Sequence, residues 1–234
     1  MRIDLHTHTL VSDGTDTPTQ LVRKAAQEGL DVIGLTDHDT FDGLREARLA
    51  GEEAGVQVLA GMEFSTERRG ASVHLLAYGC DPHDEDLLDE LARVRVGRSD
   101  RVPTMAARLT ELGMPLTVED VLRHATGTSL GRPHIADAMV EKGYVAHRDE
   151  AFRLWLHEGS PAYVDRYSTE LTRAIELVRR AKGVAVLAHP WGRGRRGDLP
   201  EAFLAELVLE HGLDGIEVDH PDHDDDTRAD LRAV

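Results

Sequence analysis

The sequence has few of the residues that mark disulfide-rich or membrane proteins. Among its 234 residues there is one cysteine, Cys80, which excludes an intramolecular disulfide framework and favours a reducing, cytoplasmic environment. No apolar run approaches the length of a membrane span, and no charged-then-apolar leader precedes the first predicted strand. We therefore expect a soluble, cytoplasmic protein without membrane contact.

Positive charge is also scarce. Lysine and arginine number 27 against 43 aspartate and glutamate residues, which gives a formal net charge of −16 at pH 7. A chain this acidic argues against general binding of DNA or RNA, because phosphate binding needs a basic surface. It does not exclude a small phosphorylated substrate, since a metal site and a few arginines can supply positive charge locally. Histidines, in contrast, are many: there are 13.

The first third of the chain alternates between predicted strands and helices. Strands are expected at 2–6, 30–36, 56–64 and 71–79, and helices at 17–29 and 41–55. Such alternation predicts the α/β class, with a parallel sheet whose faces are covered by helices. The strand at 71–79 follows the turn sequence ERRG and is expected to return along its neighbour.

The middle of the chain has no strand signals. From about residue 84 to about residue 157 the sequence is typical of consecutive helices, after which the alternation resumes with strands at 184–190 and 214–220. We therefore divide the chain into a first barrel part, a helical insert and a second barrel part. Their predicted bounds are 1–83, 84–160 and 161–234.

Two histidines, His6 and His8, form the sequence HTH at the end of the first predicted strand. Side chains at i and i+2 of a strand point to the same face, so both imidazoles can converge on one point. Neutral imidazoles that converge in this way are typical of a metal site.

Other candidate ligands also close predicted strands. Asp37 and His38 follow the strand at 30–36, Glu63 falls near the end of the next one, and His189 closes the strand at 184–190. In a parallel α/β barrel the active site lies at the carboxyl ends of the strands, so these clusters would meet at one edge.

His74 begins its strand instead of closing it. If the turn is centred between Arg68 and Arg69, an in-register hairpin would place His74 opposite Glu63, with Cβ atoms about 5 Å apart. Asp13, in VSDGT, either folds back as an oxygen ligand or caps its turn.

These candidates are too many for one ion, which accepts four to six donors. We expect a cluster of two or three divalent ions that shares a hydroxide nucleophile and binds the oxygens of a phosphate. Asp37 and His38 are the candidate catalytic residues. Asp37 has a second interpretation, in which it holds an imidazole in place.

Arginines of the helical insert are candidate phosphate contacts. Arg98 and Arg101 are one helical turn apart, and GRPHIA places Arg132 and His134 near a helix start, where backbone N–H groups favour anions. The alternative for the first pair is an ordinary solvated helix face. The aspartates around His220 are interpreted as caps of the last helix and not as ligands.

Taken together, the ordered motifs resemble the PHP (polymerase and histidinol phosphatase) superfamily over essentially the whole chain. The motifs are DLHTHTLVSDGT, GLTDHDTFDGL, GMEFST, VHLLAYG, GRPHIA and VAVLAHP. The nearest branch is that of bacterial 3′,5′-nucleoside bisphosphate phosphatases, some of which are also 5′→3′ exoribonucleases.

This resemblance implies a distorted (β/α)7 TIM-like barrel with a helical insert that binds substrate. It also implies three ions, with Mn2+ expected and Fe2+, Zn2+ or Mg2+ as alternatives. The first ion would be held by His6, His8 and Glu63. The second would be held by Glu63, His74 and His189, and the third by Asp13 and His38.

The implied activity is hydrolysis of a 3′,5′-nucleoside bisphosphate to the nucleoside 5′-monophosphate, with short RNA as a further substrate from its 5′ end. The family pattern also continues past the last helix into an Asp-x-His motif that adds two ligands and a closing strand. This chain ends at ADLRAV, so part of the barrel is expected to be missing. The alternative function is therefore a catalytically impaired domain that binds metal or nucleotide.

Overall fold

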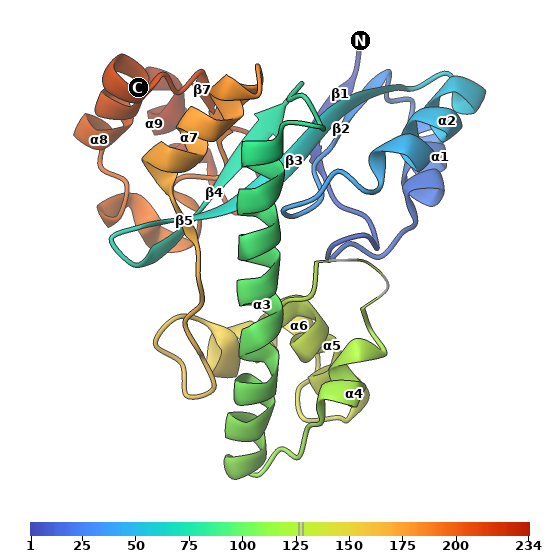
Figure 1. The fold of residues 1–234 in the computed structure, drawn as a ribbon, viewed down its shortest axis with the longest axis vertical. Helices are drawn as coiled ribbons and strands as arrows, with labels where there is room; N and C mark the ends of the chain where they lie inside the picture. The colour runs from blue at the N-terminus through green and yellow to red at the C-terminus, as the bar shows by residue number, and fades with distance from the viewer. Residues whose placement is uncertain (126, 128) are drawn as a thin grey trace.

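The computed structural model describes residues 1–125, 127 and 129–234, and it shows an α/β fold. The strands of that part of the chain are β1 (Ile3–Thr7), β2 (Val32–Leu35), β3 (Gln57–Arg68), β4 (Ala71–Tyr78), β5 (Thr169–Glu170), β6 (Val184–Leu187) and β7 (Gly215–Ile216). They form one curled sheet in the order β1-β2-β3-β4-β6-β7, and β5 pairs with β3 beside this path (Figure 1). The arrangement is that of a partial TIM-like barrel, which agrees with the predicted class.

The first half of the sheet is parallel, as predicted. β1 pairs with β2, and β2 pairs with the first four residues of β3. The predicted helices at 17–29 and 41–55 are confirmed as α1 (Pro18–Gln27) and α2 (Leu44–Ala54). Thr17 and Gln20 form a capping box at the start of α1, and Gly55 ends α2 in the left-handed conformation.

β3 is longer than the predicted strand at 56–64, because it continues into a hairpin with β4. The turn consists of Arg69 and Gly70, both with positive φ, as a two-residue type I′ hairpin requires. The pairing expected between Glu63 and His74 is therefore wrong by two residues: His74 lies opposite Ser65. A shift of two keeps every side chain on its predicted face, because strand side chains alternate with period two.

The second half of the sheet is mixed and not purely parallel. β4 runs antiparallel to both β3 and β6, whereas β6 and β7 are parallel. The helices here are α7 (Leu171–Arg180), α8 (Glu201–Glu206) and α9 (Asp225–Ala233). Asp224 caps α9, as the sequence predicted for this acidic stretch. Within the described residues, β1 and β7 are the two ends of the sheet and do not pair with each other.

A helical segment separates β4 from β5. It contains α3 (Glu85–Glu111), α4 (Val118–Leu122), α5 (Arg132–Glu141), α6 (Arg148–Ala151) and a π-helical turn, Phe152–Leu156. In Figure 1, α3 runs from beside the sheet to the group formed by α4, α5 and α6. Leu87, Leu91 and Val94 of α3 belong to the sheet's core, whereas Met105 and Leu109 belong to a second core among the helices.

Arg98 and Arg101 lie between these two apolar stretches of α3, and both are buried. α3 is long but rich in charged residues. Among the described helices, none combines the length and the apolarity that crossing a membrane requires.

Phe64 of β3 is fully buried in the sheet's core, so its side chain is expected to carry a large share of stability. The substitution Phe64→Ala should lower the free energy of unfolding by about 3–5 kcal/mol, because it removes apolar contacts and leaves a cavity. Urea denaturation followed by circular dichroism measures the change. Leu209→Ala, at a side chain that is 84% exposed, is the control and should change stability by less than about 0.5 kcal/mol. Equal effects of the two substitutions would contradict this assignment of the core.

Candidate metal centre

Five histidines surround the carboxylate of Glu63. Their rings form a closed circuit with neighbouring centroids 4.8 to 5.8 Å apart, in the order His6, His8, His38, His74, His189. β1, β3 and β4 carry members of this group, and the segments that directly follow β1, β2 and β6 carry the others. The structure therefore brings together residues that are up to 183 positions apart in the chain, counted from His6 to His189.

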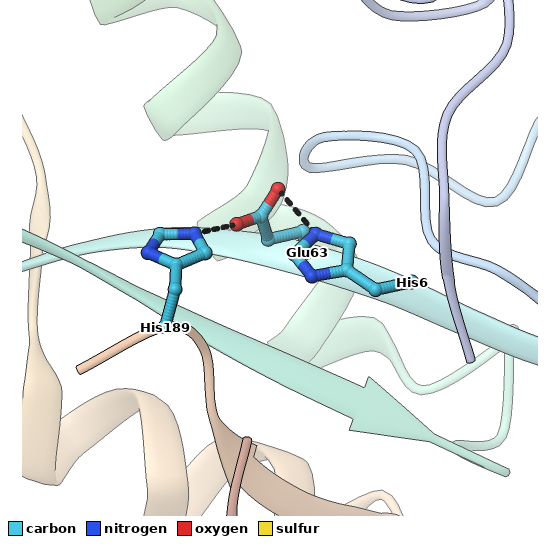
Figure 2. Close-up of side chains that lie close together, drawn as sticks. All are labelled: His6, Glu63 and His189. Atoms are coloured by element: carbon cyan, nitrogen blue, oxygen red, sulfur yellow. Dashed lines mark hydrogen bonds and ion pairs between the residues drawn. The ribbon is translucent and has the colours of Figure 1, made fainter. Parts of the chain in front are cut away.

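Both oxygens of Glu63 face imidazole nitrogens. Oε1 lies 2.8 Å from Nδ1 of His74 and 3.1 Å from Nε2 of His189. Oε2 lies within 3.3 Å of one nitrogen each of His6, His8 and His38. Figure 2 shows the carboxylate between His6 and His189. Because Glu63 is only 2% exposed, water contributes little to the solvation of its charge.

Asp13 adds a second carboxylate beside this group. Its two oxygens each lie 3.5 Å from an imidazole nitrogen, one of His8 and one of His38. The backbone carbonyl of Asp13 accepts a hydrogen bond from Arg148, whose guanidinium also pairs with Asp137. The helical segment thus holds the loop that carries Asp13.

Asp37 is buried, and its carboxylate faces that same loop. It accepts hydrogen bonds from the backbone N–H and the hydroxyl of Thr9 and from the hydroxyl of Ser12, all at 2.6 to 2.7 Å. These contacts fix the path of the chain between His8 and Asp13. His38, its neighbour, instead points into the histidine group and forms a β-bridge with Glu63.

The charges in this group depend on one another. Burial would raise the pKa of Glu63, but the surrounding imidazoles, His38 and His74 first, hold it well below its usual value. Burial opposes protonation of His6, yet the carboxylates of Glu63 and Glu217 raise its pKa to about 10. Burial lowers the pKa of His74 to about 3 despite its contact with Glu63. Some imidazoles are thus neutral at pH 7, the form that binds metal ions.

The donor set fits divalent cations. Nε2 of His6 and Nε2 of His8 are 3.1 Å apart, a separation at which two ring nitrogens need a proton or a cation between them. Nδ1 of His38 is buried and lies 3.3 Å from Oε2 of Glu63, but it forms no hydrogen bond among the described residues. Of the groups of three with geometry suited to an ion in the described part of the chain, two include Glu63: His6–Glu63–His189 and His8–His38–Glu63. The shared carboxylate favours more than one ion.

The predicted phosphate contacts lie near these ligands. Arg98 is buried, pairs with Asp39 at 2.7 Å and donates to the hydroxyl of Ser65. Arg101 is 6% exposed, and its Nε has no hydrogen-bond partner among the described residues. Burial and the neighbouring guanidiniums, of Arg132 first, lower the pKa of Arg101 well below its usual value. The solvated-face interpretation of this pair is therefore wrong.

Arg132 and His134 occupy the start of α5, as the sequence predicted. Arg132 donates to the carbonyl of Leu156, and it lines a pocket whose wall includes His74 and His189. His134 is buried, and its Nδ1 accepts the backbone N–H of Gly131. This hydrogen bond uses His134 as a helix cap.

Three residues near the site were not among the predicted ones. Glu217 lies 3.0 Å from Nδ1 of His6, and the ring of His220 lies 4.7 Å from that of His189. Both follow β7, so the strand-end rule that identified His189 would also have found Glu217. Arg166 is a further guanidinium close to Arg98 and Arg101. Burial first, and the charge of Arg98 second, lower the pKa of Arg166 to about 10. No motif marked it.

The chain matches the model of the PHP domain family over residues 4–130. It is 34% identical to a 3′,5′-nucleoside bisphosphate phosphatase of Chromobacterium violaceum, over 94% of this chain and 78% of that protein. A 5′-3′ exoribonuclease of Haemophilus influenzae is 30% identical, over 93% of this chain and 78% of that one.

Two further similar proteins have names that refer to other phosphoester reactions. A phosphoribosyl 1,2-cyclic phosphate 1,2-diphosphodiesterase of Eggerthella lenta is 35% identical, over 94% of this chain and 83% of that protein. A solved structure from Bifidobacterium adolescentis, provisionally named a metal-dependent phosphoesterase, superimposes with a TM-score of 0.93. It is 36% identical, over 99% of this chain and 82% of that one.

Acidification should destabilise the metal-free protein through His74. Its folded pKa of about 3 lies below the unfolded value of 6.5, so the unfolded state binds the proton more readily. His74 therefore costs no stability above pH 6.5. Below that pH it lowers the free energy of unfolding by about 1 kcal/mol per pH unit. The raised pKa of His6 acts in the opposite sense, but its contribution changes chiefly between pH 6.5 and pH 10, so below pH 6.5 the slope is that of His74.

Urea denaturation in excess chelator at pH 7 and pH 5 measures this effect. The substitution His74→Gln keeps a donor toward Glu63 but cannot titrate, so it should reduce the loss of stability between the two pH values. His211→Gln, at a partly exposed ring far along the chain, is the matched control. A pH dependence that is identical in His74→Gln and the control would contradict the prediction.

Proposed function

Because the chain belongs to the PHP domain family, we propose that it is a metal-dependent phosphoesterase that acts on a nucleotide phosphomonoester. The favoured reaction is hydrolysis of a 3′,5′-nucleoside bisphosphate to the nucleoside 5′-monophosphate. The observation that carries the proposal is the circuit of five imidazoles around Glu63, next to a group of buried arginines. The relatives named for bisphosphate hydrolysis and for exoribonuclease activity support the substrate class.

The proposed metal ligands are His6, His8, Asp13, His38, Glu63, His74 and His189. Divalent ions, with Mn2+ as the favoured one, would supply an acidified water and positive charge for phosphoryl oxygens. Glu63 offers one oxygen to each side of the group, which allows it to bridge two ions. His38, which lies between Asp13 and Glu63, is the proposed catalytic histidine, and Asp37 positions the loop beside it.

The arginines are proposed to bind the phosphate that is not hydrolysed. Arg98, Arg101, Arg132 and Arg166 place four positive charges close together, and Asp39 pairs with Arg98. Buried guanidiniums without enough negative charge around them are costly, and an anion with two or more negative charges would neutralise them. Ser65, which Arg98 contacts, is two residues from Glu63 on the same face of β3, about 7 Å along the strand.

The helical segment at 84–160 is proposed as the substrate-binding subdomain of a (β/α)7 barrel. α3 and α5 bring Arg98, Arg101 and Arg132 toward the sheet. A 5′-phosphorylated end of a short RNA carries a 5′-phosphate and a 3′-phosphodiester at the positions of the two phosphates of a bisphosphate, which is why both substrates are proposed. A cytoplasmic location fits these substrates.

The substitution Glu63→Gln should abolish phosphate release from adenosine 3′,5′-bisphosphate in the presence of Mn2+, with a loss of at least about 100-fold in kcat/KM. The amide can neither bridge two ions nor balance the imidazoles. Glu53→Gln, at a side chain that is 74% exposed, is the control and should keep full activity. Full activity of Glu63→Gln would refute the assignment. Binding of Mn2+ by the unaltered chain without any turnover would instead support the impaired, binding-only alternative.

The substitution Arg101→Met should raise KM for adenosine 3′,5′-bisphosphate about tenfold or more, with a much smaller effect on adenosine 3′-monophosphate. It should also raise the melting temperature of the ligand-free protein, because it removes a buried charge without a hydrogen-bond partner at Nε. Arg93→Met, at an exposed arginine of the same helix, is the matched control. Steady-state kinetics with both nucleotides and thermal denaturation check the two parts. Equal changes of KM for both nucleotides would exclude a site for the second phosphate.

A further inference from the structure

Glu217 contacts two of the proposed metal ligands at once. Its Oε1 lies 3.0 Å from Nδ1 of His6, and its Oε2 accepts the backbone N–H of His189 at 2.8 Å. The side chain of Glu217 is 12% exposed and that of His6 is 10% exposed, so both contacts are shielded from water. A single carboxylate thus joins residues from β1 and from the segment after β6.

The contact with His6 determines which ring nitrogen is free to bind a cation. Nε2 of His6 faces Glu63 and His8, whereas Nδ1 faces Glu217. An ion bound to an imidazole takes the place of the proton on one ring nitrogen, and a carboxylate at Nδ1 keeps the remaining proton there. Nε2 is then left with its lone pair directed at the centre of the histidine group.

The contact with His189 stabilises an unfavourable backbone conformation. His189 has a φ of 29°, in the left-handed region that residues other than glycine adopt at a cost. The hydrogen bond from its N–H to Glu217 helps to hold this conformation. The ring of His189 consequently lies nearly parallel to that of His6, at an interplanar angle of 13°, with its Nε2 on Glu63.

We propose that Glu217 is a positioning residue of the metal centre, which selects the Nε2 form of His6 and orients His189. The inference rests on the metal centre of the proposed function. Both oxygens of Glu217 already accept hydrogen bonds from the two ligands, which suits a carboxylate that acts through them. Glu217 also links the two ends of the sheet, because it follows β7 while His6 belongs to β1.

The test is Mn2+ binding to Glu217→Gln in the absence of substrate, measured by competition with a fluorescent chelator. An amide keeps the size of the side chain but offers one acceptor for two donors. Affinity should fall about 10- to 100-fold while the number of ions bound per chain stays the same. Asp219→Asn is the matched control, because its carboxylate is 75% exposed and pairs with Arg232. The control should bind as the unaltered protein does.

The other possible results of the Mn2+ binding experiment distinguish the inference from the proposed function. Unchanged affinity in Glu217→Gln overturns the inference. Loss of one ion with unchanged affinity for the rest also overturns it, since Glu217 would then be a direct ligand, in a group with His6 and His220. Failure of the unaltered protein to bind Mn2+ would refute the proposed function itself.

A second measurement does not depend on the variant's folding. Long-range 15N–1H spectra of the Zn2+-loaded, unaltered protein should show His6 protonated at Nδ1 and metal-bound at Nε2. Metal bound at Nδ1 of His6 would overturn the inference. The melting temperature of Glu217→Gln in chelator, compared with that of Asp219→Asn, shows separately whether the variant remains folded.

Discussion

The burial of one carboxylate governs the centre of this molecule. Glu63 is 2% exposed, and a charge without water must be balanced by partners that the fold supplies. The partners come from β1, β2, β4 and β6 or from the residues that follow these strands, so the sheet has to curl for them to meet. The site can therefore form only if the sheet is curved. Divalent ions bound here would balance this charge better than protons, since each ion would contact several of these side chains at once.

Two kinds of positive charge flank Glu63 in a protein whose formal net charge is −16. On one side are imidazoles, and among them burial lowers the pKa of His74 to about 3 whereas nearby carboxylates raise the pKa of His6 to about 10. On the other side the guanidiniums of Arg98 and Arg101 are buried and cannot adjust their protonation as imidazoles do. The acidic exterior repels polyanions in general, whereas this interior favours a small one that fits.

The strand-end rule predicted most of the site from the sequence. It placed His6, His38 and His189 at one edge because side-chain alternation and parallel pairing are local and regular. The hairpin register was wrong by two residues, since the turn needs positive φ at Arg69 and Gly70 and the predicted centre did not use the glycine, which adopts positive φ most easily. The same rule should have included Glu217. The burial of Arg101 could not be predicted, because it depends on how the helices pack against the sheet.

α3 also limits how a substrate can reach the site. Its 27 residues form a rod about 40 Å long whose two halves belong to different apolar cores. The helical segment therefore cannot swing away from the sheet as a loosely tethered lid would. The weakest point of the rod is Pro103, just past the buried arginines, where the ring removes one backbone hydrogen bond. A bend at Pro103 would move Arg98 and Arg101 relative to α4 and α5, so a change in the shape of this helix would also change the proposed phosphate-binding group.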